Sequence, residues 1–159
     1  MLDVRALDSG HMYQAAMVRR IALWRALPDL PDLHSPQEDA AYWQPHLLAE
    51  YTVLGALVDG ELAGIIAYGK GWIEQLYVLP DRQGSGIGTR LLSAAMTDMD
   101  DIRLWRFQRN HHARAFYQSH GFSPIEETDG SSNEEGEPDV LYHWCRLAEP
   151  MYNADPAGR

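Results

Sequence analysis

The chain has 159 residues, of which 45% are hydrophobic and 23% are charged, an ordinary composition for one globular domain. Its formal net charge of −10 argues against a nucleic-acid partner, because nucleic-acid-binding surfaces are basic. It shows no apolar run of the roughly 20 residues that span a bilayer, no signal-peptide pattern and only one cysteine. We therefore expect a cytoplasmic protein with no membrane partner, one domain over residues 1–150 and a flexible tail over 151–159.

Two helices are predicted at the start of the chain. Apolar residues recur at helical spacing over residues 8–26, with Asp8 or Ser9 as the N-cap. Ser35 followed by Pro36 is typical of a second helix start, and this helix should run to about residue 49.

The pattern then changes to strands alternating with helices. Asp59-Gly60 predicts a tight hairpin turn, because both central residues of such a turn need positive φ. Runs rich in β-branched and aromatic residues predict strands, and helical spacing returns between them. The expected order is ααβββαβαββ, an α+β fold with a mixed, largely antiparallel sheet and helices on both faces. The expected strands are 52–58, 62–68, 72–78, 102–107, 122–127 and 140–147, and the later helices are 87–99 and 110–120.

A glycine-rich loop, Gln83–Gly88, immediately precedes a predicted helix. Glycines at 84, 86 and 88 allow the backbone to approach a ligand closely, and the unpaired N–H groups of the helix start attract an anion such as a pyrophosphate. The loop lacks the Gly-Lys-Ser/Thr ending of a nucleoside-triphosphate loop, and its G-x-G-x-G spacing differs from the dinucleotide fingerprint. A simple helix-capping turn is the plain alternative.

Two motifs in order indicate a family. Gln83-x-x-Gly86-x-Gly88, after the strand that ends at Pro80, resembles the central motif of the GCN5-related N-acetyltransferase (GNAT) superfamily. About 22 residues later, N-x-x-A-x-x-F-Y-x-x-x-G-F from Asn110 to Phe122 resembles the second motif of that superfamily. The resemblance covers about residues 60–122. It implies transfer of an acetyl group from acetyl-CoA to an amine by direct attack in a ternary complex.

The resemblance also implies which residues hold the acyl donor. Backbone groups of Leu76 and Val78 would pair with the pantetheine arm like an added strand. Asn110 would contact that arm, although an asparagine there also suits a helix N-cap. Arg82 could meet phosphate oxygens or be a solvated surface arginine. The remaining residues expected at the acyl donor are Gln83, Gly84, Ser85, Gly86, Ile87, Gly88, Thr89 and Phe116.

Two catalytic residues are proposed from the resemblance. Tyr117 stands where the family places the acid that protonates the departing thiolate, a reaction suited to a phenol with a pKa near 10. Glu74 is the candidate base, since a carboxylate within an apolar strand, sharing a face with Trp72 and Leu76, needs a partner or a role. An ion-paired or edge-exposed glutamate, or a core tyrosine, are the structural alternatives. No Cys/His spacing supports a metal.

The distribution of charged residues along the sequence suggests which kinds of ligand the protein attracts. Residues 82–114 carry six arginines against three aspartates, a positive island that could steer an anionic ligand. The predicted loop over residues 126–139 holds seven carboxylates and no lysine or arginine, which would attract a cationic small-molecule or peptide amine, or simply aid solubility. A catalytically inactive acyl-CoA-binding sensor or scaffold is the alternative function. Dimers are frequent in the family, so a homodimer is a further expectation.

Overall fold

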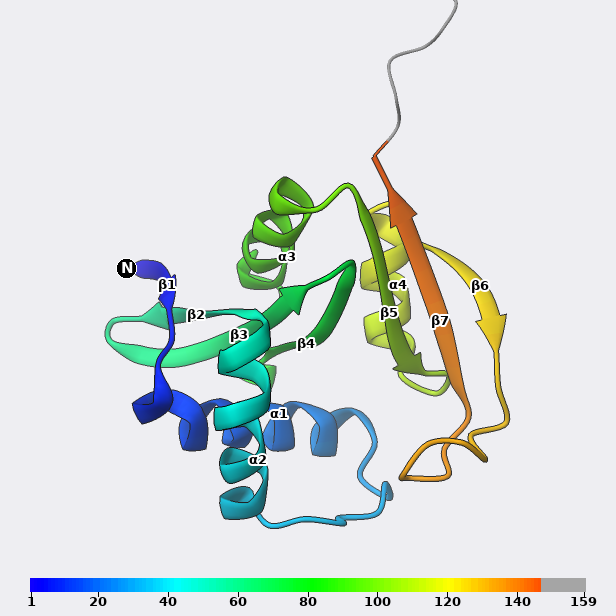
Figure 1. Ribbon diagram of the computed structural model, residues 1–159, viewed down its shortest axis with the longest axis horizontal. Helices are drawn as coiled ribbons and strands as arrows, with labels where there is room; N and C mark the ends of the chain where they lie inside the picture. Colours follow the sequence, from blue (N-terminus) through cyan, green and yellow to red (C-terminus); the bar gives the residue numbers. More distant parts are fainter. Residues whose placement is uncertain (147–159) are drawn as a thin grey trace, which may run out of the picture.

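The computed structural model describes residues 1–146 and contains a seven-stranded mixed sheet with helices on both faces (Figure 1). The strand order is β1-β2-β3-β4-β5-β7-β6, and every neighbouring pair is antiparallel except β4 and β5. The strands are β1 (Leu2–Ala6), β2 (Thr52–Val58), β3 (Glu61–Gly69), β4 (Trp72–Val78), β5 (Asp101–Phe107), β6 (Ser123–Glu127) and β7 (Asp139–Cys145). The helices are α1 (Met12–Ala26), α2 (Pro36–Glu50), α3 (Ile87–Asp98) and α4 (His111–Ser119).

The α+β class and the mixed, largely antiparallel sheet are confirmed, with one strand more than expected. β1 precedes the first helix and pairs antiparallel with β2 at the sheet edge. Most of its five residues are exposed, and Arg5 pairs with Asp3 at its surface. A half-polar edge strand gives too weak an apolar alternation to be recognised in the sequence. The expected end of β7 at residue 147, the domain boundary at 150 and the tail fall outside the described residues.

Local sequence signals explain most element boundaries. Asp59 and Gly60 adopt φ values of 51° and 87°, as the predicted hairpin turn requires. The Asp8 carboxylate accepts a hydrogen bond from the Gly10 amide at 2.9 Å, and Ser35 forms a capping box with Glu38. Within residues 1–146, no helix is both long and apolar enough to cross a bilayer.

The sheet has a hydrophobic core on each face. Helices α3 and α4 cover one face, with Leu91, Leu92 and Tyr117 among their buried residues. Helices α1 and α2 cover the other, with Met12 and Trp43 buried against β2 and β3. The second core is smaller, and the loops at its open side lie near the β6–β7 connection (Figure 1).

The sheet opens between β4 and β5. The two strands are parallel and share one register pair, Trp72 with Arg103, supported by the Arg103 amide donating to the Gly71 carbonyl at 2.8 Å. Beyond this point the strands diverge, which leaves a gap in the middle of the sheet (Figure 1). The strand edges that face the gap share no further register pair, which is where another chain or an extended ligand could pair with them.

A bulge in β4 changes which side chains share a face. Ala67 pairs with Gln75 while Tyr68 pairs with Ile73, so the register skips Glu74. Ile73 and Leu76 are consequently buried in the same core, against α3. The expectation that Glu74 shares a face with Leu76 is therefore wrong, because strict alternation requires an uninterrupted ladder.

Two ion-pair links join the α1–α2 connection to the β6–β7 loop. Arg109 bridges them, with Nη2 at 3.0 Å from Oδ1 of Asp29 and Nε at 2.8 Å from Oε2 of Glu137. His34 forms the second link, with Glu134. Hydrogen bonding to Glu134 raises the pKa of the His34 imidazole, although partial burial opposes it and Asp39 and Glu38 add to the rise.

The His34–Glu134 link should depend on pH. A raised histidine pKa means that the pair is fully formed below the ordinary value of about 6.5 and is lost as pH rises through the higher folded value. We expect an NMR titration of the His34 ring to show this raised pKa, and Glu134→Gln to lower it toward the ordinary value. Glu126→Gln, at an exposed position on β6, should leave the titration unchanged. An unchanged His34 titration in Glu134→Gln would contradict the link.

Candidate functional site

A pocket of about 550 Å³ lies where β4 and β5 diverge. Five parts of the chain surround it, namely α1, the end of β4, the glycine loop with the start of α3, the inner face of β5, and α4. The lining residues are Ala22, Arg25, Ala26, Leu76, Tyr77, Val78, Gln83, Gly84, Gly86, Gly88, Thr89, Arg106, Asn110, His112, Ala113, Phe116 and Tyr117.

The glycine loop presents backbone amides to one end of this pocket. Gly84 and Gly86 have φ values of 83° and 90°, which a residue with a Cβ rarely adopts. Gly86 is the N-cap of α3 and no side chain caps the helix, so the first amides of α3 stay available to a ligand. A Cβ on Gly88 would lie 3.3 Å from the Phe116 ring, so glycine also lets the helix start approach α4. These features make an anion site built from backbone.

Most residues expected at the acyl donor line the pocket. Three do not, namely Arg82, Ser85 and Ile87. The Ile87 side chain is buried in the core, and the Ser85 hydroxyl donates to the Arg82 carbonyl at 2.6 Å, which stabilises the loop. Those that do line it are Leu76, Val78, Gln83, Gly84, Gly86, Gly88, Thr89, Asn110 and Phe116.

Two polar side chains at the pocket already have partners. The Gln83 amide donates to the Val78 carbonyl at 3.0 Å, so this backbone acceptor is occupied by the loop itself. The Asn110 Oδ1 accepts from the Ala113 amide at 3.2 Å and caps α4. The capping alternative for Asn110 therefore holds, and its place in the pocket lining still allows contact with a ligand.

Tyr117 and Arg106 form the polar centre of the pocket. Tyr117 is only 2% exposed, and its hydroxyl accepts a hydrogen bond from Nη2 of Arg106 at 2.8 Å. Arg106 is 8% exposed and also donates to the Trp105 carbonyl at 2.6 Å. Its guanidinium carbon lies 5.1 Å from the ring centre of Tyr117 and 5.6 Å from that of Tyr77. Because its oxygen accepts from Arg106, the Tyr117 hydroxyl can direct its own proton elsewhere.

Opposing effects set the protonation of this pair. Burial raises the pKa of the Tyr117 phenol, while the charge and hydrogen bond of Arg106 act to lower it. Burial alone would lower the pKa of Arg106, but Tyr117, Tyr77 and, to a smaller extent, the charge of Glu74 outweigh this effect and the pKa is raised. Within residues 1–146, Arg106 forms no ion pair, and its hydrogen-bond acceptors are the Trp105 carbonyl and the Tyr117 hydroxyl. A buried cation with aromatic and hydroxyl partners can stabilise negative charge that develops beside it.

Arg106 was missed as a site residue in the sequence, although a signal exists. Along β5, Ile102, Leu104 and Arg106 are buried in alternation, so the arginine occupies an inward-facing position of an amphipathic strand. Three of the six arginines in the positive island form ion pairs within the protein. Arg103 lies 3.1 Å from Asp101, and Arg114 lies 4.0 Å from Glu127. Arg109 pairs with Asp29 of the α1–α2 connection and with Glu137 of the β6–β7 loop. Of the six arginines in residues 82–114, Arg106 alone lines the pocket.

Glu74 does not line this pocket, although its charge contributes to the raised pKa of Arg106. The residue is exposed at the β4 bulge, and its Oε1 accepts a hydrogen bond from the Tyr51 hydroxyl at 3.0 Å. The structure therefore brings Tyr117 to the cofactor-sized pocket but does not bring Glu74 into its lining. Across residues 1–146, no group of three or more His, Cys, Asp or Glu side chains is placed to hold a metal ion.

Solved structures with this fold come from several organisms. Apo YjaB of Escherichia coli superposes with a TM-score of 0.75 at 15% identity, covering 92% of this chain and 99% of YjaB. YncA of Salmonella typhimurium, whose structure holds its cofactor acetyl-CoA, gives a TM-score of 0.72 at 18% identity over 94% of this chain and 98% of YncA. PaiA N-acetyltransferase of Thermoplasma acidophilum, in complex with coenzyme A, gives 0.65 at 21% over 91% and 99%. At 15–21% sequence identity, the similarity to these three structures establishes the fold of this chain.

Sequence comparison establishes the family. An uncharacterised N-acetyltransferase of Archaeoglobus fulgidus is 32% identical over 98 residues, which are 52% of this chain and 66% of that relative, slightly less than two thirds of its length. The model of the acetyltransferase (GNAT) family matches residues 18–122, a span that contains the glycine loop and both motif helices. The chain therefore belongs to the GNAT acetyltransferase family.

Proposed function

We propose that this protein is an N-acetyltransferase that transfers the acetyl group of acetyl-CoA to a primary amine by direct attack in a ternary complex. The observation that carries the proposal is the buried Tyr117–Arg106 pair, which stands in the gap between β4 and β5 beside the glycine loop. The catalytically inactive acyl-CoA-binding module stays the alternative, and turnover of an amine distinguishes the two.

The pocket fits an extended molecule with a pyrophosphate at one end. The free amides at the start of α3 suit the pyrophosphate, and Gly84 and Gly86 let it approach the backbone. Leu76 and Val78 of β4 line the same pocket as Asn110, the N-cap of α4, and Phe116 of α4, which suits a pantetheine arm. Gln83 would release the Val78 carbonyl to let the arm pair with this strand.

The bound acyl donor supplies a thioester, whose carbonyl carbon forms a bond to the amine nitrogen as its bond to sulfur breaks. Tyr117 then donates its proton to the departing sulfur, and Arg106 stabilises the resulting phenolate through its hydrogen bond. The amine nitrogen loses one proton to water, and the phenolate regains one from water. The role of Glu74 as a base stays a prediction, and from its exposed position it would act through water.

Removing the Tyr117 hydroxyl should separate catalysis from binding. We expect Tyr117→Phe to lower kcat roughly 100-fold, the ordinary contribution of a positioned general acid, while the affinity for coenzyme A stays nearly unchanged. Thiol release measures the rate and calorimetry the affinity. Tyr142→Phe is the matched control, because Tyr142 is equally buried but its hydroxyl bonds Arg114 outside the pocket. Unchanged turnover in Tyr117→Phe would exclude this acid.

Arg106 should control the pH profile of the reaction. Without the opposing charge of Arg106, burial and Tyr77 both act to raise the pKa of Tyr117, so this pKa rises further and the alkaline limb of the rate profile moves to higher pH. We therefore expect Arg106→Met to lower kcat and shift this limb upward, and Arg106→Lys to restore part of both. A lower rate with an unshifted limb would indicate a purely structural role.

The glycine loop should control affinity for the acyl donor. Gly86→Ala forces a Cβ residue to a φ of 90°, at a cost of about 1–2 kcal/mol. If the native loop geometry is what binds the pyrophosphate, the affinity for coenzyme A in calorimetry should fall by about tenfold. Gly60→Ala carries similar strain, at a φ of 87°, in the turn between β2 and β3, and should leave that affinity unchanged. Equal affinity losses in both variants would contradict a specific role of the loop.

A further inference from the structure

The Tyr77 side chain connects the two faces of the sheet across the gap. Tyr77 is half-buried and packs against the core under α1 and α2, and it also lines the pocket between β4 and β5. Arg106 belongs to the other face, because it follows Ile102 and Leu104 in the buried alternation of β5. The centre of the Tyr77 ring nevertheless lies 5.6 Å from the guanidinium carbon of Arg106, which is within the range of a cation–π contact.

The backbone does not fix these two residues relative to each other. Tyr77 of β4 pairs with Ile65 of β3, and Arg106 of β5 pairs with Val140 of β7. Within residues 1–146, the one register pair between β4 and β5 lies at the first residue of β4. At the level of Arg106, side-chain contacts across the gap therefore do what a ladder of hydrogen bonds does in a closed sheet.

Hydrogen bonds hold only part of the Arg106 guanidinium. Its Nη1 donates to the Trp105 carbonyl at 2.6 Å and its Nη2 to the Tyr117 hydroxyl at 2.8 Å, and within residues 1–146 it has no ion-pair partner. An arginine side chain has many rotamers, and its planar guanidinium stacks well on an aromatic ring. The ring of Tyr77 supplies such a contact from β4.

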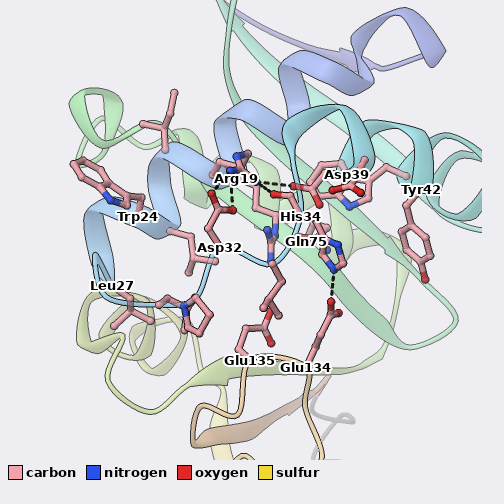
Figure 2. A pocket seen from close by; sticks show the side chains of 18 residues that line it. Arg19, Trp24, Leu27, Asp32, His34, Asp39, Tyr42, Gln75, Glu134 and Glu135 are labelled. Atoms are coloured by element: carbon pink, nitrogen blue, oxygen red, sulfur yellow. Dashed lines mark hydrogen bonds and ion pairs between the residues drawn. The ribbon is translucent and has the colours of Figure 1, made fainter.

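The Tyr77 ring also has a cationic neighbour on the side of α1. The guanidinium carbon of Arg19 lies 6.0 Å from the same ring centre. Arg19 lines a second pocket, of about 770 Å³, together with the α1–α2 connection, α2 and the β6–β7 loop (Figure 2). The Tyr77 ring thus contacts one arginine from each of the two pockets.

We propose that Tyr77 is a positioning residue, whose ring holds the Arg106 guanidinium in the orientation that bonds the Tyr117 hydroxyl. The importance of this contact for the reaction rests on the proposed function, in which Arg106 stabilises the phenolate of Tyr117. Tyr77 acts through Arg106 and takes no part in the proton transfer itself.

Two substitutions separate the ring of Tyr77 from its hydroxyl. In the thiol-release assay, we expect Tyr77→Leu to lower kcat about tenfold, a factor that corresponds to one desolvated cation–π contact. Tyr77→Phe keeps the ring on Arg106, so its kcat should stay within about twofold of that of the unsubstituted protein. An equal loss in both variants would assign the effect to the hydroxyl and overturn the inference.

A double-mutant cycle tests whether Tyr77 acts through Arg106. In the Arg106→Met background, Tyr77→Leu should cause no further loss of kcat, because the guanidinium that the ring holds is gone. A further loss of the same size would mean that Tyr77 acts independently of Arg106, and would overturn the inference. Trp144→Leu is the matched control. Its ring lies 5.5 Å from the guanidinium carbon of Arg146, outside both pocket linings, so kcat should not change.

NMR of the free protein with labelled arginine provides a readout that needs no turnover. A guanidinium held in one orientation rotates slowly about its Cζ–Nε bond and gives separate Nη signals, whereas a mobile one gives an averaged signal. We expect slow rotation of the Arg106 guanidinium in the unsubstituted protein, in Tyr77→Phe and in Trp144→Leu. The rotation should be faster in Tyr77→Leu. Equally slow rotation in Tyr77→Leu would overturn the inference.

The outcomes separate the inference from the proposed function. Turnover of an amine, with the same kcat and the same Arg106 rotation in Tyr77→Leu as in the unsubstituted protein, overturns the inference and leaves the acetyltransferase proposal standing. Absence of turnover with every amine overturns the proposed function. Faster Arg106 rotation in Tyr77→Leu but not in Tyr77→Phe would in that case still support the positioning of Arg106 by the Tyr77 ring.

Discussion

Beyond Trp72 and Arg103, the parallel strands β4 and β5 share no further register pair in the described part of the chain. The sheet would otherwise be continuous, and its middle would be filled by a ladder of backbone hydrogen bonds. Divergence leaves the facing edges of both strands available, and it brings the inner face of β5 and the helix α4 to the same opening. The glycine loop follows directly from β4, so its free amides lie at one end of that opening. The position of the whole site thus depends on where two strands separate.

Separation of the strands also explains how a charged side chain can be buried in the centre of the sheet. Arg106 takes a position that would face a neighbouring strand's side chains in a closed sheet. In the gap it instead contacts the Tyr117 hydroxyl, a backbone carbonyl and two aromatic rings. These partners hold the guanidinium without neutralising it, so the pocket keeps a positive charge where the proposed reaction releases a thiolate. A carboxylate partner would have cancelled this field.

The two faces of the sheet border different pockets. On the gap side, backbone amides and the Tyr117–Arg106 pair suit an anionic, extended donor. On the α1 and α2 side, a second pocket is lined by α1, the α1–α2 connection, α2 and the β6–β7 loop. Neighbouring residues of β4 connect the two environments, because Gln75 lines one pocket and Leu76 lines the other. Ion pairs of Arg109 and His34 hold the loops of the second pocket together.

The features that depend on a few neighbouring residues could be predicted from the sequence. The glycine loop, the Asp59-Gly60 turn, the Ser35 cap and the order of nearly all elements follow from φ preferences, capping and side-chain periodicity, which act over a few neighbouring residues. Tertiary structure alone decided the rest. Arg106 meets Tyr117 only because β5 and α4 border one gap, the bulge at Glu74 reassigns the faces of β4, and long-range ion pairs engage Arg109 and Arg114 of the positive island. These outcomes depend on contacts between segments far apart in the chain, which residue patterns within one segment do not encode.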